Sequence, residues 1–347
     1  MSSQVSVTTP EVIVIGAGVA GLECARTLAA GGRRVLVVDR ARGVGGRCAT
    51  RRFEQQPVDF GPLFLHGSDA AFLAAIASVP GVTPLADWPH RVEGRGAPCQ
   101  PASFNPGERR FAFAEGLAAF PRHLAQGLTV KLSTRVVRLS AGERTFLVHT
   151  EAGEVLEASD VVVALALEQS RALLGTLPQT PEVAGALGLL GMFASVPSLT
   201  LIAGYGLETP APAWDVQYPE DSDCLQLIAN DSAKRKAPRA RVLVLQARPR
   251  WSRQRLELPA ETWAAELLAE AAGRVGAWAA QPLFSAPHRW SYARVERGSE
   301  LAQPLSLSLP GGQRLGLAGD LFAPGGGVQA AWLSGNHLAQ RLLQENP

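Results

Sequence analysis

The sequence predicts an α/β protein in which a parallel-sheet domain, assembled from separated segments, carries an inserted α+β domain with an antiparallel sheet. Three observations predict this class. Near the N-terminus an apolar run, a helical repeat and a second apolar run follow one another; the middle of the chain alternates apolar and polar residues; and an apolar strand followed by a helix closes the chain. The 347 residues, 46% of them hydrophobic, are enough to bury a large core.

The first predicted unit is a β-strand, a helix and a second parallel strand. Residues 12–15, "VIVI", are β-branched, as in a strand buried on both faces. Residues 19–30 place apolar side chains on one helical face, and the two glycines at 31–32 end that helix. Residues 34–39, "RVLVVD", form the next buried strand, so we expect a parallel sheet covered by helices.

The following segment predicts a change to antiparallel pairing. Residues 115–126 have helical spacing, and residues 128–141 and 145–159 alternate like paired strands with a turn at "EAGE". Residues 160–167 return to a continuous apolar strand, and residues 182–193 again have helical spacing.

Three further strands are expected at 199–205, 224–230 and 241–247. The segment "KRKAPRAR" at 234–241 separates the last two and indicates a solvated hairpin loop, with phosphate binding as the alternative interpretation. Residues 260–278 have the pattern of an amphipathic helix, with Trp263, Leu267, Leu268 and Trp278 as its large apolar residues.

The last predicted strand spans residues 314–320, and the last helix runs from about residue 328 to 344. We therefore expect a discontinuous nucleotide-binding domain and an inserted substrate domain. The first comprises residues 1–88, 115–167 and 288–347, and the second comprises residues 89–114 and 168–287.

Composition excludes several classes of protein. The formal net charge of +2 gives no electrostatic footprint for nucleic acid. The N-terminal "MSSQVSVTTPE" lacks the basic and apolar regions of a signal peptide, and no apolar stretch is long enough to span a membrane, so we expect a cytoplasmic protein without a membrane partner. The four cysteines form no CxxC pair, so we expect neither a metal site nor a disulfide framework.

A glycine motif lies between the first strand and the first helix. Gly16, Gly18 and Gly21 form GxGxxG, and Asp39 ends the second strand 23 positions after Gly16. The first glycine permits the tight turn, the second lets backbone approach a pyrophosphate, and the third permits close helix–strand packing. The helix N-terminus favours the pyrophosphate charge, and Asp39 can accept hydrogen bonds from ribose hydroxyls. An ordinary glycine-rich turn would not account for Asp39, so the motif predicts dinucleotide binding.

The residues after Asp39 indicate which dinucleotide is bound. They begin with Arg40 and contain the doublet Gly45-Gly46 followed by Arg47. A doublet at this spacing is similar to one in FAD proteins and is not needed in a domain that binds only NAD. Arg47 is placed to meet phosphate or flavin. The alternative is a flexible loop.

Three more stretches extend the resemblance to flavoproteins. They are "PVDFGPLFLHG" at 57–67, "HRWSYARVE" at 288–296 and "LAGDLFAPGGGVQAAWLSG" at 317–335. With residues 12–52, they resemble the renalase-like branch of the flavin-containing amine oxidase superfamily. The chain departs from that pattern at Gly61-Pro62, where relatives usually have Gly-Ala, and at Gln329, where Glu is commoner.

The resemblance implies a Rossmann-like FAD-binding domain of the glutathione-reductase type and FAD bound without a covalent link. It implies hydride transfer from an isomeric dihydronicotinamide, NAD(P)H, to flavin N5, with electrons passed to O2 to give H2O2. Two alternatives stay open. One is another amine oxidase or desaturase-type oxidoreductase acting on a small molecule, and the other is a non-redox FAD-dependent isomerase.

Candidate substrate residues lie on the predicted strand at 288–296. His288, Trp290 and Tyr292 alternate, so their side chains would face one side, toward either the substrate cavity or the core. His66 and either Arg51 or Arg52 could reach the flavin edge.

The resemblance also assigns roles in the C-terminal motif. It places Asp320 against the ribityl-phosphate region and the helix start at Gly327 and Val328 near the pyrimidine edge of the flavin. Positive partial charge at that helix start would stabilise the anion that forms on reduction. Trp332 would face either the cavity or the core.

Overall fold

The computed structural model describes residues 10–94, 104–296 and 298–345. The chain folds into two compact units. Unit 1 comprises Met1–Gly46, Leu124–Ala194 and Val295–Pro347, and unit 2 comprises Arg47–His123 and Ser195–Arg294.

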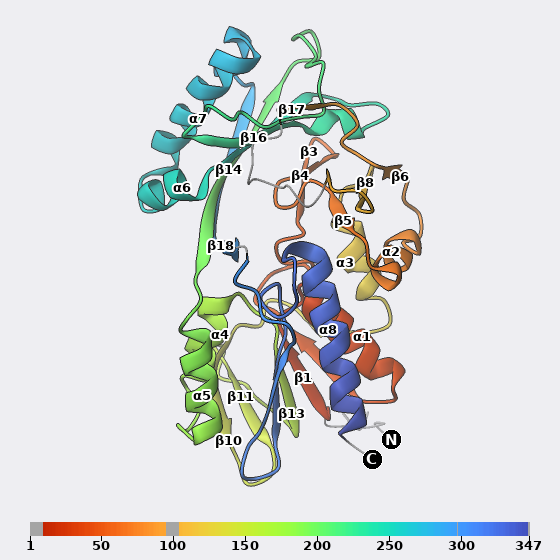
Figure 1. The fold of residues 1–347 in the computed structure, drawn as a ribbon, viewed down its shortest axis with the longest axis vertical. Helices are drawn as coiled ribbons and strands as arrows, with labels where there is room; N and C mark the ends of the chain where they lie inside the picture. The colour runs from red at the N-terminus through yellow and green to blue at the C-terminus, as the bar shows by residue number, and fades with distance from the viewer. Residues whose placement is uncertain (1–9, 95–103, 297, 346–347) are drawn as a thin grey trace, which may run out of the picture. The chain divides into compact units, whose positions relative to one another are not determined.

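Unit 1 is built on a six-stranded sheet in the order β19-β20-β13-β1-β2-β9 (Figure 1). The pairs β20–β13, β13–β1, β1–β2 and β2–β9 are parallel, and β19 is antiparallel to β20. The β-branched residues explain the central strands, which are buried along their length. The strands are β1 (Val12–Ile15), β2 (Val35–Val38), β9 (Thr129–Lys131), β13 (Asp160–Val163), β19 (Leu305–Ser308) and β20 (Arg314–Leu317).

In the part of unit 1 that the structure describes, a second sheet and four helices complete the fold. The sheet is antiparallel, with the order β10-β11-β12. Helices α1 and α8 pack against each other on one side of the six-stranded sheet, and α4, α5 and the smaller sheet lie on the other side (Figure 1). The elements are β10 (Val136–Ala141), β11 (Phe146–Thr150), β12 (Val155–Ala158), α1 (Val19–Ala30), α4 (Leu167–Leu174), α5 (Pro181–Leu190) and α8 (Gly327–Gln344).

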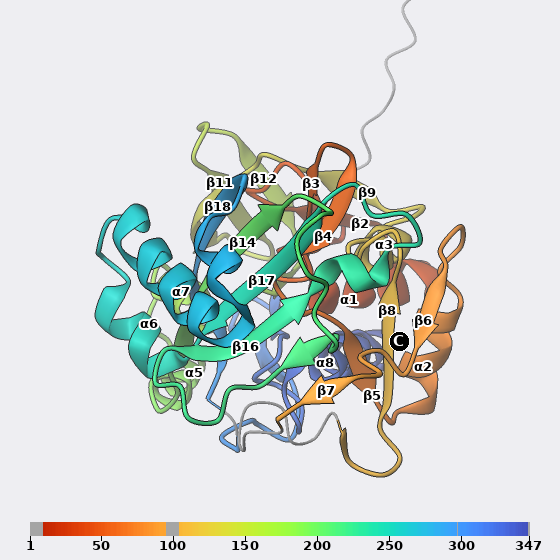
Figure 2. The same ribbon diagram turned by 90° about the horizontal axis from the view of Figure 1, so that it is seen from above.

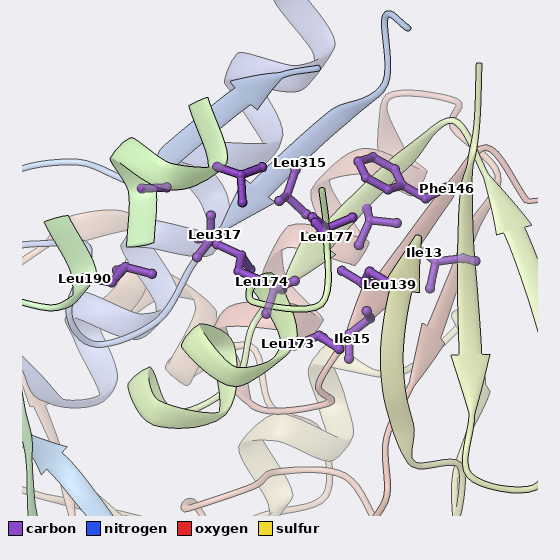
Figure 3. Packing of buried hydrophobic residues seen from close by; sticks show 14 of the residues in the cluster. Ile13, Ile15, Leu139, Phe146, Leu173, Leu174, Leu177, Leu190, Leu315 and Leu317 are labelled. Atoms are coloured by element: carbon purple, nitrogen blue, oxygen red, sulfur yellow. The ribbon is translucent and has the colours of Figure 1, made fainter. Parts of the chain in front are cut away.

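The core of unit 1 joins segments that are far apart in the sequence (Figure 3). Ile13 of β1, Phe146 of β11, Leu174 of α4 and Leu315 of β20 are all fully buried in one cluster. The first and last segments of the chain therefore share one core, and burial of this apolar surface is what holds the discontinuous unit together.

Unit 2 contains a six-stranded sheet in the order β18-β14-β17-β16-β15-β7, a two-stranded sheet β3-β4 and a three-stranded sheet β5-β8-β6. Pairing in the large sheet is antiparallel from β14 through β17 and β16 to β15, and β7 joins β15 in parallel. Its strands are β3 (Thr50–Phe53), β4 (Gln56–Asp59), β5 (Leu65–Gly67), β6 (Pro84–Ala86), β7 (Val92–Glu93), β8 (Arg109–Phe113), β14 (Ser195–Tyr205), β15 (Val216–Gln217), β16 (Leu225–Asn230), β17 (Arg241–Ala247) and β18 (Phe284–Val295).

Helices α6 and α7 lie beside the large sheet of unit 2 (Figure 2). Trp263 and Leu267 of α7 are fully buried in a cluster with Leu199 of β14 and Leu245 of β17. The helices of unit 2 are α2 (Ala70–Ala77), α3 (Ala119–Leu124), α6 (Pro249–Arg255), α7 (Ala260–Val275) and the 3-10 helices η2 (Asp231–Lys234) and η3 (Ala277–Ala280).

Several predicted elements are shorter or paired differently. Residues 129–131 of the expected antiparallel segment form β9, which pairs in parallel with β2. The apolar run 160–167 is a strand only to Val163, and Leu167 already begins α4. The helix expected over 115–126 spans only Ala119–Leu124.

The limits of the two compact units differ from the predicted domain limits. Three ranges of the predicted nucleotide-binding domain belong to unit 2, namely residues 47–88, 115–123 and 288–294. Residues 168–194 belong to unit 1, where α4 and α5 bury leucines in its core. Part of the predicted substrate segment 89–114, namely residues 95–103 with Cys99, lies outside the described residues.

No helix in the described residues is both long and apolar enough to cross a membrane. No group of three or more histidines, cysteines or acidic residues in the same part of the chain could hold a metal ion. Burial raises the pKa of the Cys24 thiol, which lies inside unit 1.

Candidate functional site

The glycine turn after β1 is shaped by close backbone contacts. Gly16 has φ +112°, and a Cβ there would lie 2.4 Å from the Ala164 carbonyl oxygen. A Cβ on Gly21 would lie 2.0 Å from the Gly16 oxygen. In contrast, a Cβ on Gly18 would have no atom within 4 Å. The turn therefore needs Gly16 and Gly21 for its own packing, whereas Gly18 faces open space that a ligand could occupy.

Asp39 is fixed beside this turn by backbone donors. Its Oδ2 accepts a hydrogen bond from the Ala17 N–H at 2.6 Å, and its Oδ1 accepts one from the Ala41 N–H at 2.7 Å. An ionised carboxylate has about four lone-pair sites. Two bonds therefore leave acceptor capacity for ribose hydroxyls, and the neighbouring Arg40 is exposed.

The Gly45-Gly46 doublet packs onto the same turn. Gly45 forms an isolated parallel bridge with Gly18, and its N–H donates to the Ala17 carbonyl at 2.8 Å. Gly46 has φ +54°, and a Cβ there would lie 3.4 Å from Gly18 Cα. Arg47 begins unit 2, where its guanidinium donates to the Ala293 carbonyl at 3.2 Å.

The C-terminal glycine loop has the features of a second anion-binding turn in unit 1. Gly325, Gly326 and Gly327 all have positive φ, at +87°, +61° and +74°. Helix α8 begins at the last of these glycines, Gly327, without a side-chain cap and without an acidic residue in its first turn. The N-cap residue Gly326 has no side chain to cap the helix, and the helix dipole places positive partial charge at this end.

Other residues of the C-terminal motif are buried or half-buried. Asp320 is 7% exposed, and its Oδ2 accepts from the Val295 N–H at 3.4 Å. Val328 and Gln329 are half-buried, and Trp332 is 4% exposed.

The residues of unit 1 fit FAD on these observations. Gly18 and Gly327 both leave space where a Cβ would stand, and α1 and α8 both begin without a side-chain cap. Asp39 retains acceptor capacity beside the first turn. FAD combines a pyrophosphate, a ribose, a ribityl chain and a flavin ring that becomes anionic on reduction. The helix N-termini can interact with the negatively charged groups, and the Asp39 carboxylate can accept hydrogen bonds from the ribose hydroxyls.

Unit 2 brings together two of the three predicted substrate residues. His288 and Trp290 alternate on β18, and their ring centroids lie 4.2 Å apart. Phe60 packs against both rings, with centroids at 5.0 Å from His288 and 5.3 Å from Trp290. The Arg51 guanidinium lies 4.8 Å from the centre of the Phe60 ring. We call Arg51, Phe60, His288 and Trp290 the aromatic–basic cluster.

The backbone beside Phe60 holds this cluster in place. The Trp290 indole donates to the Phe60 carbonyl at 3.1 Å, and the Gln246 amide donates to the Gly61 carbonyl at 2.6 Å. A Cβ on Gly61 would lie 2.0 Å from the Arg47 carbonyl oxygen. Gly61 therefore cannot carry a side chain without a shift of the backbone.

The His288 ring is neutral at ordinary pH. Burial, and then the positive charge of Arg51, lower the pKa of His288 to about 4. One Arg51 nitrogen lies 3.3 Å from His288 Nδ1. A guanidinium is a donor only, so Nδ1 accepts in this contact.

The remaining candidates lie outside the cluster. Tyr292 is 37% exposed, and the ring contacts of the described residues do not join it to the cluster. Arg52 is exposed and donates to the Gln55 carbonyl. His66 Nδ1 lies 3.2 Å from Glu108, in a different part of unit 2.

The prediction of a solvated loop at 234–241 is wrong for its first two residues, whose side chains are buried. Lys234 is fully buried, and its ammonium lies 2.8 Å from Asp59 and 2.9 Å from Asp231. Arg235 is also buried and pairs with Asp231 at 2.7 Å. We call Asp59, Asp231, Lys234 and Arg235 the buried charge quartet.

Asp59 and Arg235 have further partners outside the quartet. Asp59 accepts from the Thr50 hydroxyl and the Leu117 N–H, and Arg235 donates to three backbone carbonyls. Burial acts to raise the pKa of Asp59, but the charges of Lys234 and Arg235 hold it below its usual value. The spacing D-x-x-K-R at 231–235 predicts the ion pairs within this segment. No such signal indicates Asp59, because it lies 175 positions before Lys234.

Comparison with known protein families gave two matches. Residues 101–343 match the family described as flavin containing amine oxidoreductase, and residues 14–76 match the NAD(P)-binding Rossmann-like domain. The predicted α/β class with a Rossmann-like domain is confirmed, and the flavin of the family confirms the expected FAD cofactor and the oxidoreductase class.

Comparison with curated proteins matched a short stretch. The putative flavin-containing monoamine oxidase AofH of Mycobacterium tuberculosis is 44% identical over 66 residues, which is 19% of this chain and 14% of that protein. The probable polyamine oxidase 4 of Arabidopsis thaliana is 43% identical over 75 residues, which is 21% of this chain and 15% of that protein. The matched stretches thus span a small part of these relatives' length.

Solved structures share the fold along nearly the whole chain. A putrescine oxidase with a redesigned cofactor site has a TM-score of 0.74 at 15% identity, covering 97% of this chain and 99% of that chain. A putative protoporphyrinogen oxidase from Exiguobacterium has a TM-score of 0.73 at 12% identity, covering all of both chains. Cyclohexylamine oxidase from Brevibacterium oxydans has a TM-score of 0.72 at 14% identity, covering 97% and 99%.

Proposed function

Because the chain belongs to the family of flavin containing amine oxidoreductases, we propose that it is an oxidase that accepts a hydride from an isomeric dihydronicotinamide, as renalase-like proteins do. Bound FAD would supply a hydride acceptor, flavin N5, and O2 would then take both electrons and become H2O2. Unit 1 would bind the FAD, and the aromatic–basic cluster of unit 2 would contact the substrate. One dihydronicotinamide, one O2 and one proton give the oxidised nicotinamide and H2O2.

The charge of the aromatic–basic cluster is the observation that supports this substrate. An alkylamine is protonated at neutral pH, since its pKa is about 10. Arg51 carries a positive charge into the cluster, and His288 cannot offset it because the ring is neutral. The nearby carboxylate of Asp59 is paired with Lys234. A positive cluster disfavours an ammonium substrate and favours a planar ring that carries phosphates.

Oxidation of an amine is the second candidate. It is supported by the similar proteins, which include a probable polyamine oxidase, a putrescine oxidase and a cyclohexylamine oxidase. The positive charge of Arg51 argues against it.

Anaerobic reduction of the bound flavin distinguishes these candidates. Purified holoenzyme is mixed with the 2- and 6-dihydro isomers of NAD(P)H, with ordinary NADH, and with putrescine and cyclohexylamine, while flavin absorbance is followed. We expect rapid bleaching by at least one dihydro isomer, and formation of H2O2 once air is admitted. Bleaching by amines alone would refute the proposal. Free FAD mixed with the same donors is the control for uncatalysed reduction.

A further inference from the structure

The contact between Arg51 and His288 determines where the imidazole carries its proton. The Arg51 nitrogen lies 3.3 Å from Nδ1, and the contact is partly buried. Because the guanidinium has five donors and no acceptor, Nδ1 must provide the lone pair. A neutral ring with an unprotonated Nδ1 carries its hydrogen on Nε2.

We propose that Arg51 is a positioning residue that fixes His288 in the Nε2–H tautomer, so that His288 acts as a neutral hydrogen-bond donor toward the substrate. The inference rests on the proposed function only for the identity of the acceptor, which would be a carbonyl or anionic oxygen of the substrate. The tautomer itself follows from the residues of unit 2.

The aromatic neighbours restrict the orientation of the His288 ring. Phe60 meets the imidazole at 79° and Trp290 meets it at 66°, so both contacts are edge-to-face. Trp290 and Phe60 are themselves joined by the indole hydrogen bond to the Phe60 carbonyl. Rotation of the imidazole would therefore disturb packed rings as well as the contact with Arg51.

Arg51 is the charge that faces the ring from the surrounding strands. On β3, Arg52 turns to the Gln55 carbonyl, and on β4, Asp59 is paired with Lys234. On β18, Arg289 lies over Trp263, whereas Tyr292 and Arg294 lie four and six residues further along the strand. The adjacent β14, "SVPSLTLIAGY", has no charged residue.

The protonation state supports a donor role rather than a base. Burial and Arg51 lower the pKa of His288 to about 4, below the ordinary value of about 6.5. A ring that is neutral from pH 5 to 8 shows no titration there, so the substrate contact through Nε2–H would be independent of pH in this range.

Nitrogen NMR of the substrate-free holoenzyme tests the inference. The chain has six histidines, and the variant His288→Gln identifies the His288 signals by their disappearance. Spectra are recorded from pH 4 to 9 for the native protein, Arg51→Met, Arg51→Lys and the neighbouring control Arg52→Met. In the native protein we expect Nε2 protonated, Nδ1 unprotonated and no titration above pH 5.

Arg51→Met removes both the donor and the charge from the cluster. We expect a mixture of the two tautomers and a rise in the His288 pKa on the order of 1 unit, with the remainder of the shift kept by burial. Arg51→Lys should restore the low pKa, and Arg52→Met should leave the signals unchanged. The pH profile of flavin reduction by the donor should gain a step at the raised pKa in Arg51→Met alone.

Two results would overturn the inference. One is a native spectrum with the proton on Nδ1, and the other is an Arg51→Met spectrum identical to the native one. The NMR titration needs no substrate, so a failure of the proposed dihydronicotinamide oxidation is detected separately by the donor panel.

Discussion

Lys234 shows how far the chemistry of a single residue depends on its partners. Its ammonium group lies between Asp59 and Asp231 and 4.6 Å from the centre of the Trp88 ring. With Arg235 the quartet has two positive and two negative charges, so the buried charges balance. Removal of one partner would leave an uncompensated charge in the interior, which costs far more than the net value of the ion pair.

We predict that Lys234→Met lowers the free energy of unfolding by about 3–5 kcal/mol. The methionine side chain is similar in length to that of lysine, but Asp59 and Asp231 then share one positive partner, Arg235. Urea denaturation measures the change. The matched control is Lys236→Met, because Lys236 is exposed two positions later and should change stability by less than about 0.5 kcal/mol. Equal loss in the two variants would refute the structural role of the quartet.

For single residues, the sequence predicts a role only where a local motif indicates it. Asp39 is such a residue, since its distance from Gly16 and its place at a strand end are visible in the chain. Lys234 is not, because its segment has the composition of a surface loop and its partner Asp59 comes from another strand, 175 positions away. Only the folded chain brings the two charges together.

The turn between β1 and α1 is an element in which each glycine meets a different constraint. Gly18 has φ −77° and ψ 177°, which any residue can adopt, and its Cβ direction is open. Gly21 lies in the helix, where a Cβ would strike the Gly16 carbonyl oxygen at 2.0 Å. A side chain at Gly18 would therefore affect the space for a ligand, whereas a side chain at Gly21 would affect the packing of the turn.

We predict opposite phenotypes for two alanine substitutions in this turn. Gly18→Ala should leave the apoprotein as stable as the native chain, within about 1 kcal/mol, but should weaken FAD binding at least tenfold because the methyl group occupies the space for the pyrophosphate. Gly21→Ala should destabilise the apoprotein by about 1–3 kcal/mol through overpacking. Thermal unfolding of apoprotein and fluorescence titration with FAD measure the two effects. If Gly18→Ala retained full FAD affinity, the proposed pyrophosphate position would be wrong.

Elements differ in how well periodicity predicts them. The strand–helix–strand unit at the N-terminus is predicted closely, because β-branched runs, helical spacing and glycines agree there. The prediction of antiparallel pairing is wrong for β9, which pairs with β2 in parallel. Three alternating residues do not reveal whether the neighbouring strand runs parallel or antiparallel. The end of β13 is also not visible in an apolar run, because it depends on the approach of Ala164 to Gly16.

At the scale of the whole molecule, both glycine-rich turns belong to unit 1 although more than three hundred residues separate them. Helices α1 and α8, which follow the two turns, pack directly against each other. A Cβ on Gly335 of α8 would lie 2.2 Å from the Ala20 carbonyl of α1, and Asn336 donates to the buried Glu23 at 2.9 Å. The two turns are thus parts of one body, and we infer that they hold different ends of one FAD.

Hydrogen–deuterium exchange with mass spectrometry tests this division. ADP contains the pyrophosphate and adenosine end of FAD but no flavin. We predict that saturating ADP slows exchange in peptides that cover residues 12–39 and leaves residues 317–335 unchanged, whereas FAD slows exchange in both. The reason is that amide N–H groups at a helix start become protected only when a ligand accepts their hydrogen bonds. Peptides from α7 in unit 2 are the control for global stabilisation, which would slow exchange everywhere at once. Protection of residues 317–335 by ADP alone would mean that the C-terminal turn contacts the nucleotide end, and the proposed arrangement of FAD would have to be reversed.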